Sequence, residues 1–138
     1  MSSAIGYQGE RPVPKYNFGK PAKLLITERR FCDVVIFDCS GRLVVGNHTE
    51  QLFEAVRTAM DSSRWLLVNL SGVSAVDSGG LGILVLLHRF ADAGLCDLKI
   101  CSLPRHISDL LHLTGLHMVL DVHANEDRAI ESFYRTAA

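Results

Sequence analysis

The chain has 138 residues, a net charge of -1 and 21% charged residues. A chain of this length can bury one hydrophobic core, so we expect a single domain that requires no disulfide or structural metal. The near-neutral charge gives no basic field of the kind that binds nucleic acids or anionic membranes, which excludes both as expected partners.

Neither a membrane span nor a metal site is expected. The longest apolar stretch, Leu81 to Leu87, is too short to cross a bilayer, and the N-terminus has no basic region followed by an apolar one. We therefore expect a cytoplasmic protein. The cysteines are not spaced as C-x-x-C and have no histidine pair beside them, so we expect buried, reduced thiols on strands, no metal and no cofactor. They are Cys32, Cys39, Cys96 and Cys101.

Residues 1–23 read as a mobile N-terminal tail, and residues 24–138 as the folded domain. The tail is rich in proline and glycine and shows no apolar periodicity. Its aromatic residues, Tyr7, Tyr16 and Phe18, are more than a solvated linker needs, so part of the tail is expected to dock.

The domain is predicted to begin with β structure. Leu24 to Arg30 can form an edge strand, and Asp33 to Cys39 is a stronger strand rich in β-branched and aromatic residues. Ser40-Gly41 then reads as a turn, and Arg42 to Val45 as a returning strand that Gly46-Asn47 ends. This pattern predicts an antiparallel hairpin.

Helices and strands then alternate. A helix with an apolar stripe through Leu52 and Val56 is expected to be capped by Asn47 or Thr49. The apolar run Trp65 to Leu70 is typical of a central strand buried on both faces, and Ser71-Gly72 is expected to end it.

The second half of the chain continues the alternation. The expected elements are a helix from Ser78 to about Ala93, a strand from Asp97 to Ser102, a helix that Pro104 opens and Gly115 ends, a strand from Met118 to Val122, and a final helix capped by Asn125. The predicted fold class is therefore α/β, with right-handed parallel crossovers in a mixed sheet.

The junction between the central strand and its helix is the candidate site. Asp77 and Ser78 are residue types that accept hydrogen bonds from the first turn of a helix. Gly79, Gly80 and Gly82 carry no side chains to shield that end, which favours close approach by another group. The alternative is that Asp77 and Ser78 only cap the helix and that the glycines permit close packing.

The helix after Ser78 is unusually apolar. From Leu81 to Leu87 it has no polar face for nearly two turns, whereas a helix on a sheet needs only one apolar stripe. Either another molecule covers part of this surface, or the tail or a neighbouring helix does.

The segment VSAVDSGGLG resembles the D-S-[ST/A]-G-L-G signature of the STAS domain, a family of bacterial anti-sigma factor antagonists. Asp33 to Gly46 resembles the family's opening hairpin, Leu66 to Leu70 its central strand, and Leu110 to Leu116 its helix ending in T-G-L. The resemblance implies a STAS-like α/β fold: a mixed sheet with an N-terminal hairpin and about four helices.

The resemblance also implies a function: the unphosphorylated protein captures an anti-sigma factor, and that factor, a serine-protein kinase of the histidine-kinase-like ATPase type, inactivates it. Ser78 matches the phosphoacceptor, and a serine phosphatase is a further implied partner. The implied partner-binding residues are Asp77, Gly79, Gly80, Leu81 and Gly82, with Gly41, Arg42 and Asn47 beside them. Two positions depart from the family: Gly79 replaces a frequent second Ser or Thr, and Val44 a frequent Asp.

Two other classes of function stay open. A STAS subunit can work without phosphorylation, as a scaffold in a sensor assembly or as a subunit of a transporter. A serine hydrolase would need a base among the six histidines, but Ser78 lacks the G-x-S-x-G elbow. A nucleotide site is also weak, because no Lys follows the glycines as the P-loop pattern requires.

Overall fold

The structure, a computed structural model, describes residues 23–137, and side chains as far as residue 135. The predicted tail therefore lies outside the described residues, apart from Lys23. The elements are β1 Leu25–Phe31, β2 Val34–Leu43, α2 Thr49–Ala59, β3 Trp65–Val76, α3 Ser78–Ala93, β4 Asp97–Cys101, α4 Arg105–Thr114, the 3-10 helix η2 Leu116–Met118, β5 Val122–His123 and α5 Glu126–Ala137. The predicted α/β class is confirmed.

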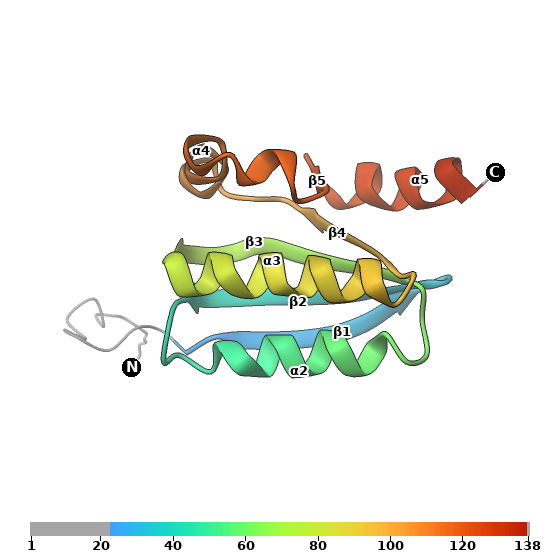
Figure 1. Cartoon of the computed structure of the whole chain (residues 1–138), viewed down its shortest axis with the longest axis horizontal. Helices are drawn as coiled ribbons and strands as arrows, with labels where there is room; N and C mark the ends of the chain where they lie inside the picture. Colours follow the sequence, from blue (N-terminus) through green and yellow to red (C-terminus); the bar gives the residue numbers. More distant parts are fainter. Residues whose placement is uncertain (1–22, 138) are drawn as a thin grey trace, which may run out of the picture.

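The five strands form one mixed sheet in the order β1-β2-β3-β4-β5. β1 is antiparallel to β2, and the other neighbours are parallel. Figure 1 shows α2 and α3 running along the sheet. α5 packs on the opposite face, where Ala129 and Phe133 meet Val34 and Ile36. Each connection between parallel strands contains a helix, namely α2, α3 or α4, as the alternation of the sequence predicts.

Side-chain alternation along β2 divides the core in two. Val35, Phe37 and Cys39 face the larger cluster, to which α2, α3 and α4 contribute, and Val34 and Ile36 face a smaller one. The smaller cluster contains Ala129 and Phe133 of α5. The central position of Trp65–Leu70 is confirmed, because β3 lies between β2 and β4.

The predicted hairpin is wrong in its turn. The chain reverses at Cys32-Asp33, where Cys32 has φ 53°, and Ser40-Gly41 lies inside the continuous strand β2. Gly41 has φ 101° and sits between two register shifts of the β2–β3 pairing, so the turn-like residues mark an irregularity of the strand.

The predicted end of β3 is also wrong. The strand continues through Ser71-Gly72 to Val76. A Cβ at Gly72 would lie 2.9 Å from the Cys39 carbonyl oxygen, so this glycine permits close approach of two strands where their register shifts.

Three smaller predictions need correction. α2 has His48 at its N-cap without a side-chain cap, because the Asn47 and Thr49 side chains donate to the carbonyls of Arg42 and Val44 instead. The strand predicted over 118–122 is η2 followed by the two-residue β5. Cys32 is exposed and Cys96 half-buried, whereas Cys39 and Cys101 are buried on strands as expected.

The predicted cap of α5 is present. Asn125 Oδ1 accepts a hydrogen bond from the Arg128 backbone N–H at 2.9 Å.

Burial raises the pKa of the Cys39 thiol to about 12, so this thiol is protonated at neutral pH.

Candidate functional site

The candidate site lies at the carboxyl ends of β2 and β3, where β3 leads into α3. β3 ends at Val76 and α3 begins at Ser78, as the sequence predicts. The end of β2 lies against this junction, because the Asp77 backbone N–H donates to the Leu43 carbonyl at 3.4 Å. Carboxyl ends of parallel strands are the usual place for a functional site in such a sheet.

Asp77 caps α3 and also fastens the neighbouring loop. One carboxylate oxygen accepts a hydrogen bond from the Gly80 backbone N–H at 2.9 Å, and the other accepts one from the Val45 N–H at 3.0 Å. These two backbone donors, Gly80 first, lower the pKa of Asp77 below its ordinary value. Both carboxylate oxygens thus accept hydrogen bonds from backbone groups of the chain.

Ser78 is the first residue of α3 and is exposed. Asp77 provides the cap, so the interpretation of Ser78 as a second capping residue is wrong. No hydrogen bond joins the Ser78 hydroxyl to another group in the part of the chain that the structure describes. The hydroxyl is therefore open to a reaction partner without loss of a structural contact.

The three glycines do not share one role. A Cβ at Gly80 would lie 2.0 Å from the Leu43 carbonyl oxygen, and one at Gly79 would lie 2.0 Å from Val45 Cγ2. A Cβ at Gly82 would meet nothing within 4 Å. Gly80 therefore permits α3 to pack against the backbone at the end of β2, and Gly79 leaves room for the exposed Val45 side chain. Of the three glycines, Gly82 alone faces open space.

The other predicted neighbours of the site divide in the same way. Arg42 is exposed, whereas Asn47 is 5% exposed and its amide donates to the Arg42 carbonyl at 2.7 Å. Gly41 of β2 is paired with Val73 of β3, and the Gly41 carbonyl accepts a hydrogen bond from Ser74 Oγ at 3.3 Å. Asn47 and Gly41 shape the loop from within, and Arg42 is the one of the three whose side chain is available.

Val45 also borders the candidate site, in the segment from Gly41 to Asn47, although the sequence predicts no separate role for it. Its side chain is 70% exposed and lies against Gly79, beside Ser78. A valine at the end of an apolar strand gives no signal of such a role, because hydropathy alone would bury it.

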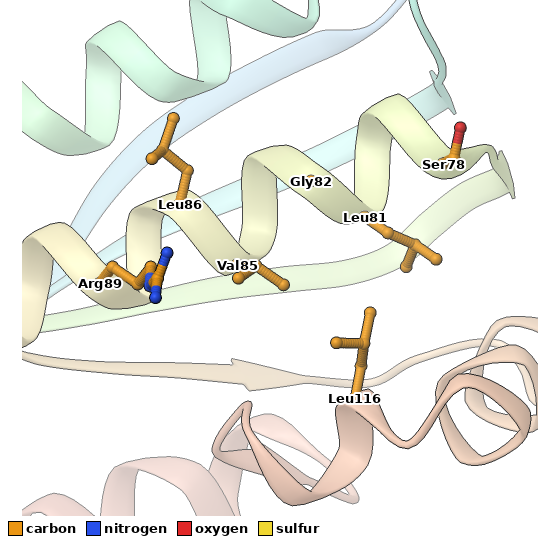
Figure 2. Close-up of a pocket in the computed structure, with 7 residues that line it drawn as sticks. All are labelled: Ser78, Leu81, Gly82, Val85, Leu86, Arg89 and Leu116. Carbon is orange, nitrogen blue, oxygen red and sulfur yellow. The ribbon is translucent and has the colours of Figure 1, made fainter.

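A groove of about 430 Å³ runs along α3 from Ser78. Figure 2 shows its wall on α3, with Leu116 of η2 directed toward Leu81 from the opposite side. Leu86 is 40% exposed on this wall. The residues that line the groove are Ser78, Leu81, Gly82, Val85, Leu86, Arg89 and Leu116.

A comparison of the sequence with protein families identifies the family of this domain. The STAS domain family model matches residues 26–129, which is most of the chain. The chain belongs to the STAS domain family.

Solved structures of similar fold include anti-sigma factor antagonists. One from Mycobacterium paratuberculosis superposes with a TM-score of 0.71 at 21% identity, over 80% of this chain and 93% of that one. The phosphorylated form of the Bacillus cell fate determinant SpoIIAA gives 0.61 at 19% identity, over 79% and 99%. A chain from the stressosome, described as a signal integration and transduction hub, gives 0.62 at 13% identity, over 80% and 98%.

The structure gives a physical reason for one departure of this STAS domain from the family signature. Gly79 replaces a frequent Ser or Thr, and Val45 fills the space in which a side chain at residue 79 would begin. Val44, the second departure, is half-buried, and its carbonyl accepts a hydrogen bond from Thr49 Oγ1 at 2.6 Å.

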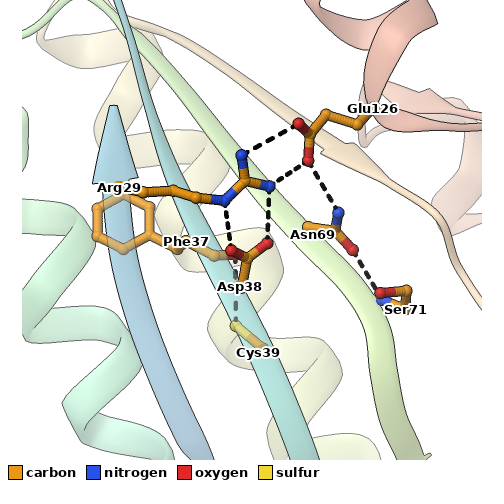
Figure 3. A network of polar contacts seen from close by, with 7 residues as sticks. All are labelled: Arg29, Phe37, Asp38, Cys39, Asn69, Ser71 and Glu126. Atoms are coloured by element: carbon orange, nitrogen blue, oxygen red, sulfur yellow. Dashed lines mark hydrogen bonds and ion pairs between the residues drawn. The ribbon is translucent and has the colours of Figure 1, made fainter. Parts of the chain in front are cut away.

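A polar network lies on the other face of the STAS sheet. Figure 3 shows Arg29 between two carboxylates, those of Asp38 and Glu126. Glu126 also accepts a hydrogen bond from the Asn69 amide at 3.2 Å. These bonds raise the pKa of Arg29, with Asp38 as the main cause. The network joins β1, β2 and β3 to the start of α5, with one guanidinium shared by two carboxylates.

A Ser-His-Asp group occurs near β5 but lacks the geometry of a catalytic triad. His123 Nε2 lies 2.8 Å from Asp121 Oδ1 and 3.4 Å from Ser132 Oγ. A triad needs the acid and the nucleophile on different ring nitrogens, so that one orients the ring while the other exchanges a proton. Asp121 is instead shared with the buried Lys99 amine at 2.7 Å.

Within residues 23–137, no group of three or more His, Cys, Asp or Glu side chains is arranged to hold a metal ion. No helix in the same part of the chain is long and apolar enough to cross a membrane.

Proposed function

We propose that this STAS domain is an anti-sigma factor antagonist that is switched off by phosphorylation of Ser78. The observation that carries the proposal is the state of Ser78: it is exposed and has no capping role, and it stands at the head of an apolar groove. A phosphoacceptor must present its hydroxyl to a kinase, and Ser78 can do so without breaking a bond of the fold.

Phosphorylation would change the charge of the site strongly. A phosphoryl group adds about 1.5 to 2 negative charges at neutral pH. It would stand at the positive end of α3, next to the Asp77 carboxylate, whose oxygens already hold the Gly80 and Val45 N–H groups. The added charge would therefore repel both Asp77 and any acidic group of a bound partner.

The partner surface is proposed to combine the exposed members of the site. These are Ser78, Val45, Arg42 and Gly82, together with the apolar wall of the groove. Asn47 and Gly80, which the family resemblance also implies, act indirectly because both are buried. The proposed partner is an anti-sigma factor that is also a serine kinase of the histidine-kinase-like ATPase type, and a serine phosphatase would reverse the modification.

In this proposed role the protein regulates transcription in the bacterial cytoplasm by binding its partner, without catalysis of its own. Its family membership and the named antagonists among its structural neighbours support this role.

Two substitutions of Ser78 test the proposal. Ser78→Asp places a negative charge in the interface, and Ser78→Ala removes the hydroxyl without adding charge. Because Asp77 is the cap, both variants should unfold within about 0.5 kcal/mol of the wild type. Ser78→Asp should bind the anti-sigma factor at least about tenfold more weakly, whereas Ser78→Ala should bind it normally. Equal binding by both variants would oppose a charge switch at Ser78.

A second candidate function is that of a STAS scaffold that is not phosphorylated, in a sensor assembly or as a transporter subunit. The similarity to a stressosome chain favours it, as does Val45, which occupies the space beside Ser78 that a second hydroxyl would need. On this alternative both Ser78 variants bind as the wild type does, and no kinase of the host modifies the protein.

A further inference from the structure

The groove along α3 is open in the described part of the chain. Its lining includes Leu81, Val85, Leu86 and Leu116, and none of residues 23–135 fills the space of about 430 Å³ between them. Exposed apolar surface rimmed by polar residues is one mark of a place where another segment or protein binds. The question is what covers it in the free chain.

The 22 residues that precede the described part enter the domain at the same end of the sheet. A Cβ at Gly41 would lie 2.3 Å from the Lys23 carbonyl oxygen, so residue 23 passes directly over β2 at Gly41. Two residues further along β2, Leu43 contacts Asp77 at the start of α3. The preceding segment therefore begins near the Ser78 end of the groove.

The segment is long enough for the distances involved. From β1 to β3 the sheet spans two strand spacings, roughly 10 Å. Phe18 is five residues from Lys23, which allows a reach of about 17 Å in an extended chain. The groove spans twelve residues of α3, from Ser78 to Arg89, or about 17 Å of helix. Residues 7–18 in an extended chain are long enough to cover it.

The composition of the segment also matches the groove. It contains three aromatic residues, Tyr7, Tyr16 and Phe18, and a Pro-Val-Pro sequence that favours the extended conformation in which peptides occupy apolar grooves. Glu10 is its only acidic residue. Arg89, at the far end of the groove, is exposed and has no carboxylate partner among the described residues.

We infer that residues 7–18 bind in the α3 groove of the free protein, with Phe18 and Tyr16 toward the Ser78 end and Glu10 toward Arg89. The segment then covers part of the surface that the proposed partner would use, so partner binding has to displace it. This inference concerns the free chain and is tested without a partner or a kinase, so it can fail while the proposed function stands.

The first test uses limited trypsin digestion of the full chain. Arg11 and Lys20 are each followed by proline, so Lys15-Tyr16 is the bond in residues 1–22 that trypsin can cut readily. Gly82→Gln fills the groove with a side chain and leaves the sequence of the segment unchanged, since a Cβ at Gly82 has open space. We expect cleavage after Lys15 to be about tenfold faster in Gly82→Gln, as for the loss of one buried aromatic contact.

Thr58→Gln, an exposed position on α2, is the matched control and should cleave as the wild type does. An unchanged rate in Gly82→Gln would overturn the inference. Acceleration by both variants would do the same, because it would show a general effect of the added side chain.

A second test follows the groove directly by methyl NMR of the full chain. The double variant Tyr16→Ser with Phe18→Ser should shift the methyl signals of Leu81, Leu86 and Leu116, because aromatic rings have left their surroundings. Lys20→Ser, in the same segment, should leave them in place. If the double variant moves the signals of Leu25 on β1 instead, the segment docks on the edge strand and the inference is wrong.

Discussion

Replacing Gly80 with alanine tests how closely α3 approaches the end of β2. The added Cβ would lie 2.0 Å from the Leu43 carbonyl oxygen, and the two atoms must separate by about 1 Å to reach the 3.0 Å below which such contacts are essentially not seen. That movement would strain the Asp77 N–H to Leu43 carbonyl bond and the Asp77 cap.

The expected change in the free energy of unfolding combines two costs and one gain. Overpacking of a tight contact costs about 1 to 3 kcal/mol, and loss of a cap costs about 1 kcal/mol. Replacing glycine by alanine inside a helix returns up to about 1 kcal/mol. The expected net effect of Gly80→Ala is a loss of about 2 kcal/mol in the free energy of unfolding, measured by urea titration.

Gly82→Ala is the matched control, two residues along the same helix. Its Cβ meets nothing within 4 Å, so the helix preference acts unopposed and the variant should gain up to about 1 kcal/mol. The two variants should therefore differ by about 3 kcal/mol. If both alanines stabilise the protein alike, the close packing of α3 against Leu43 is refuted, and Gly80 was as open as Gly82.

Two further predictions concern the same junction. Gly79→Ala should destabilise the protein, and adding Val45→Ala should recover much of the loss; a double-mutant cycle by urea titration should give a coupling of about 1 kcal/mol, and additive effects would show that the two residues do not touch. Asp77→Asn should lower stability at pH 7 but much less at pH 2.5. The pKa of Asp77 is lower when folded than its ordinary 3.8, so its contribution is present above that value and lost as the pH falls through the folded pKa. An equal deficit at both pH values would contradict this cause.

The sequence predicted the fold class because its strongest patterns are periodic. The apolar run at Trp65–Leu70 and the helical stripes on α2 and α3 lie where the structure has a central strand and two covering helices. The fold class therefore follows from patterns that depend on burial, whereas the family resemblance rests on the segment VSAVDSGGLG.

The errors arose where glycine has more than one use. Gly41 and Gly72 were predicted to end strands, yet both permit close contacts where the register of β2 and β3 shifts. Such a shift depends on two strands far apart in the sequence, so no local pattern reveals it. Positive φ at Gly41 and a turn look the same from the sequence.

The start of α3 follows from the sequence, but the separate roles of the residues at that start do not. The sequence located Asp77 and Ser78 at a helix start, and the structure confirms that start. The sequence alone does not show whether Asp77 or Ser78 is the cap, because both side chains can accept the same hydrogen bonds. Val45, whose backbone N–H donates to the Asp77 carboxylate, is 32 residues away in the sequence, so no local pattern reveals this bond. Asp77 therefore holds the loop and caps α3, and the Ser78 hydroxyl stays available.

The most direct measurement of the central claim is the intact mass of the protein after incubation with ATP and each histidine-kinase-like anti-sigma factor of its host. We predict that one of these kinases adds a single phosphoryl group to the wild type and to Ser74→Ala, whose exposed serine lies near the end of β3, and adds none to Ser78→Ala. A phosphoryl group that persists in Ser78→Ala, or wild-type protein left unmodified by every such kinase, would contradict the assignment of Ser78 as the switch.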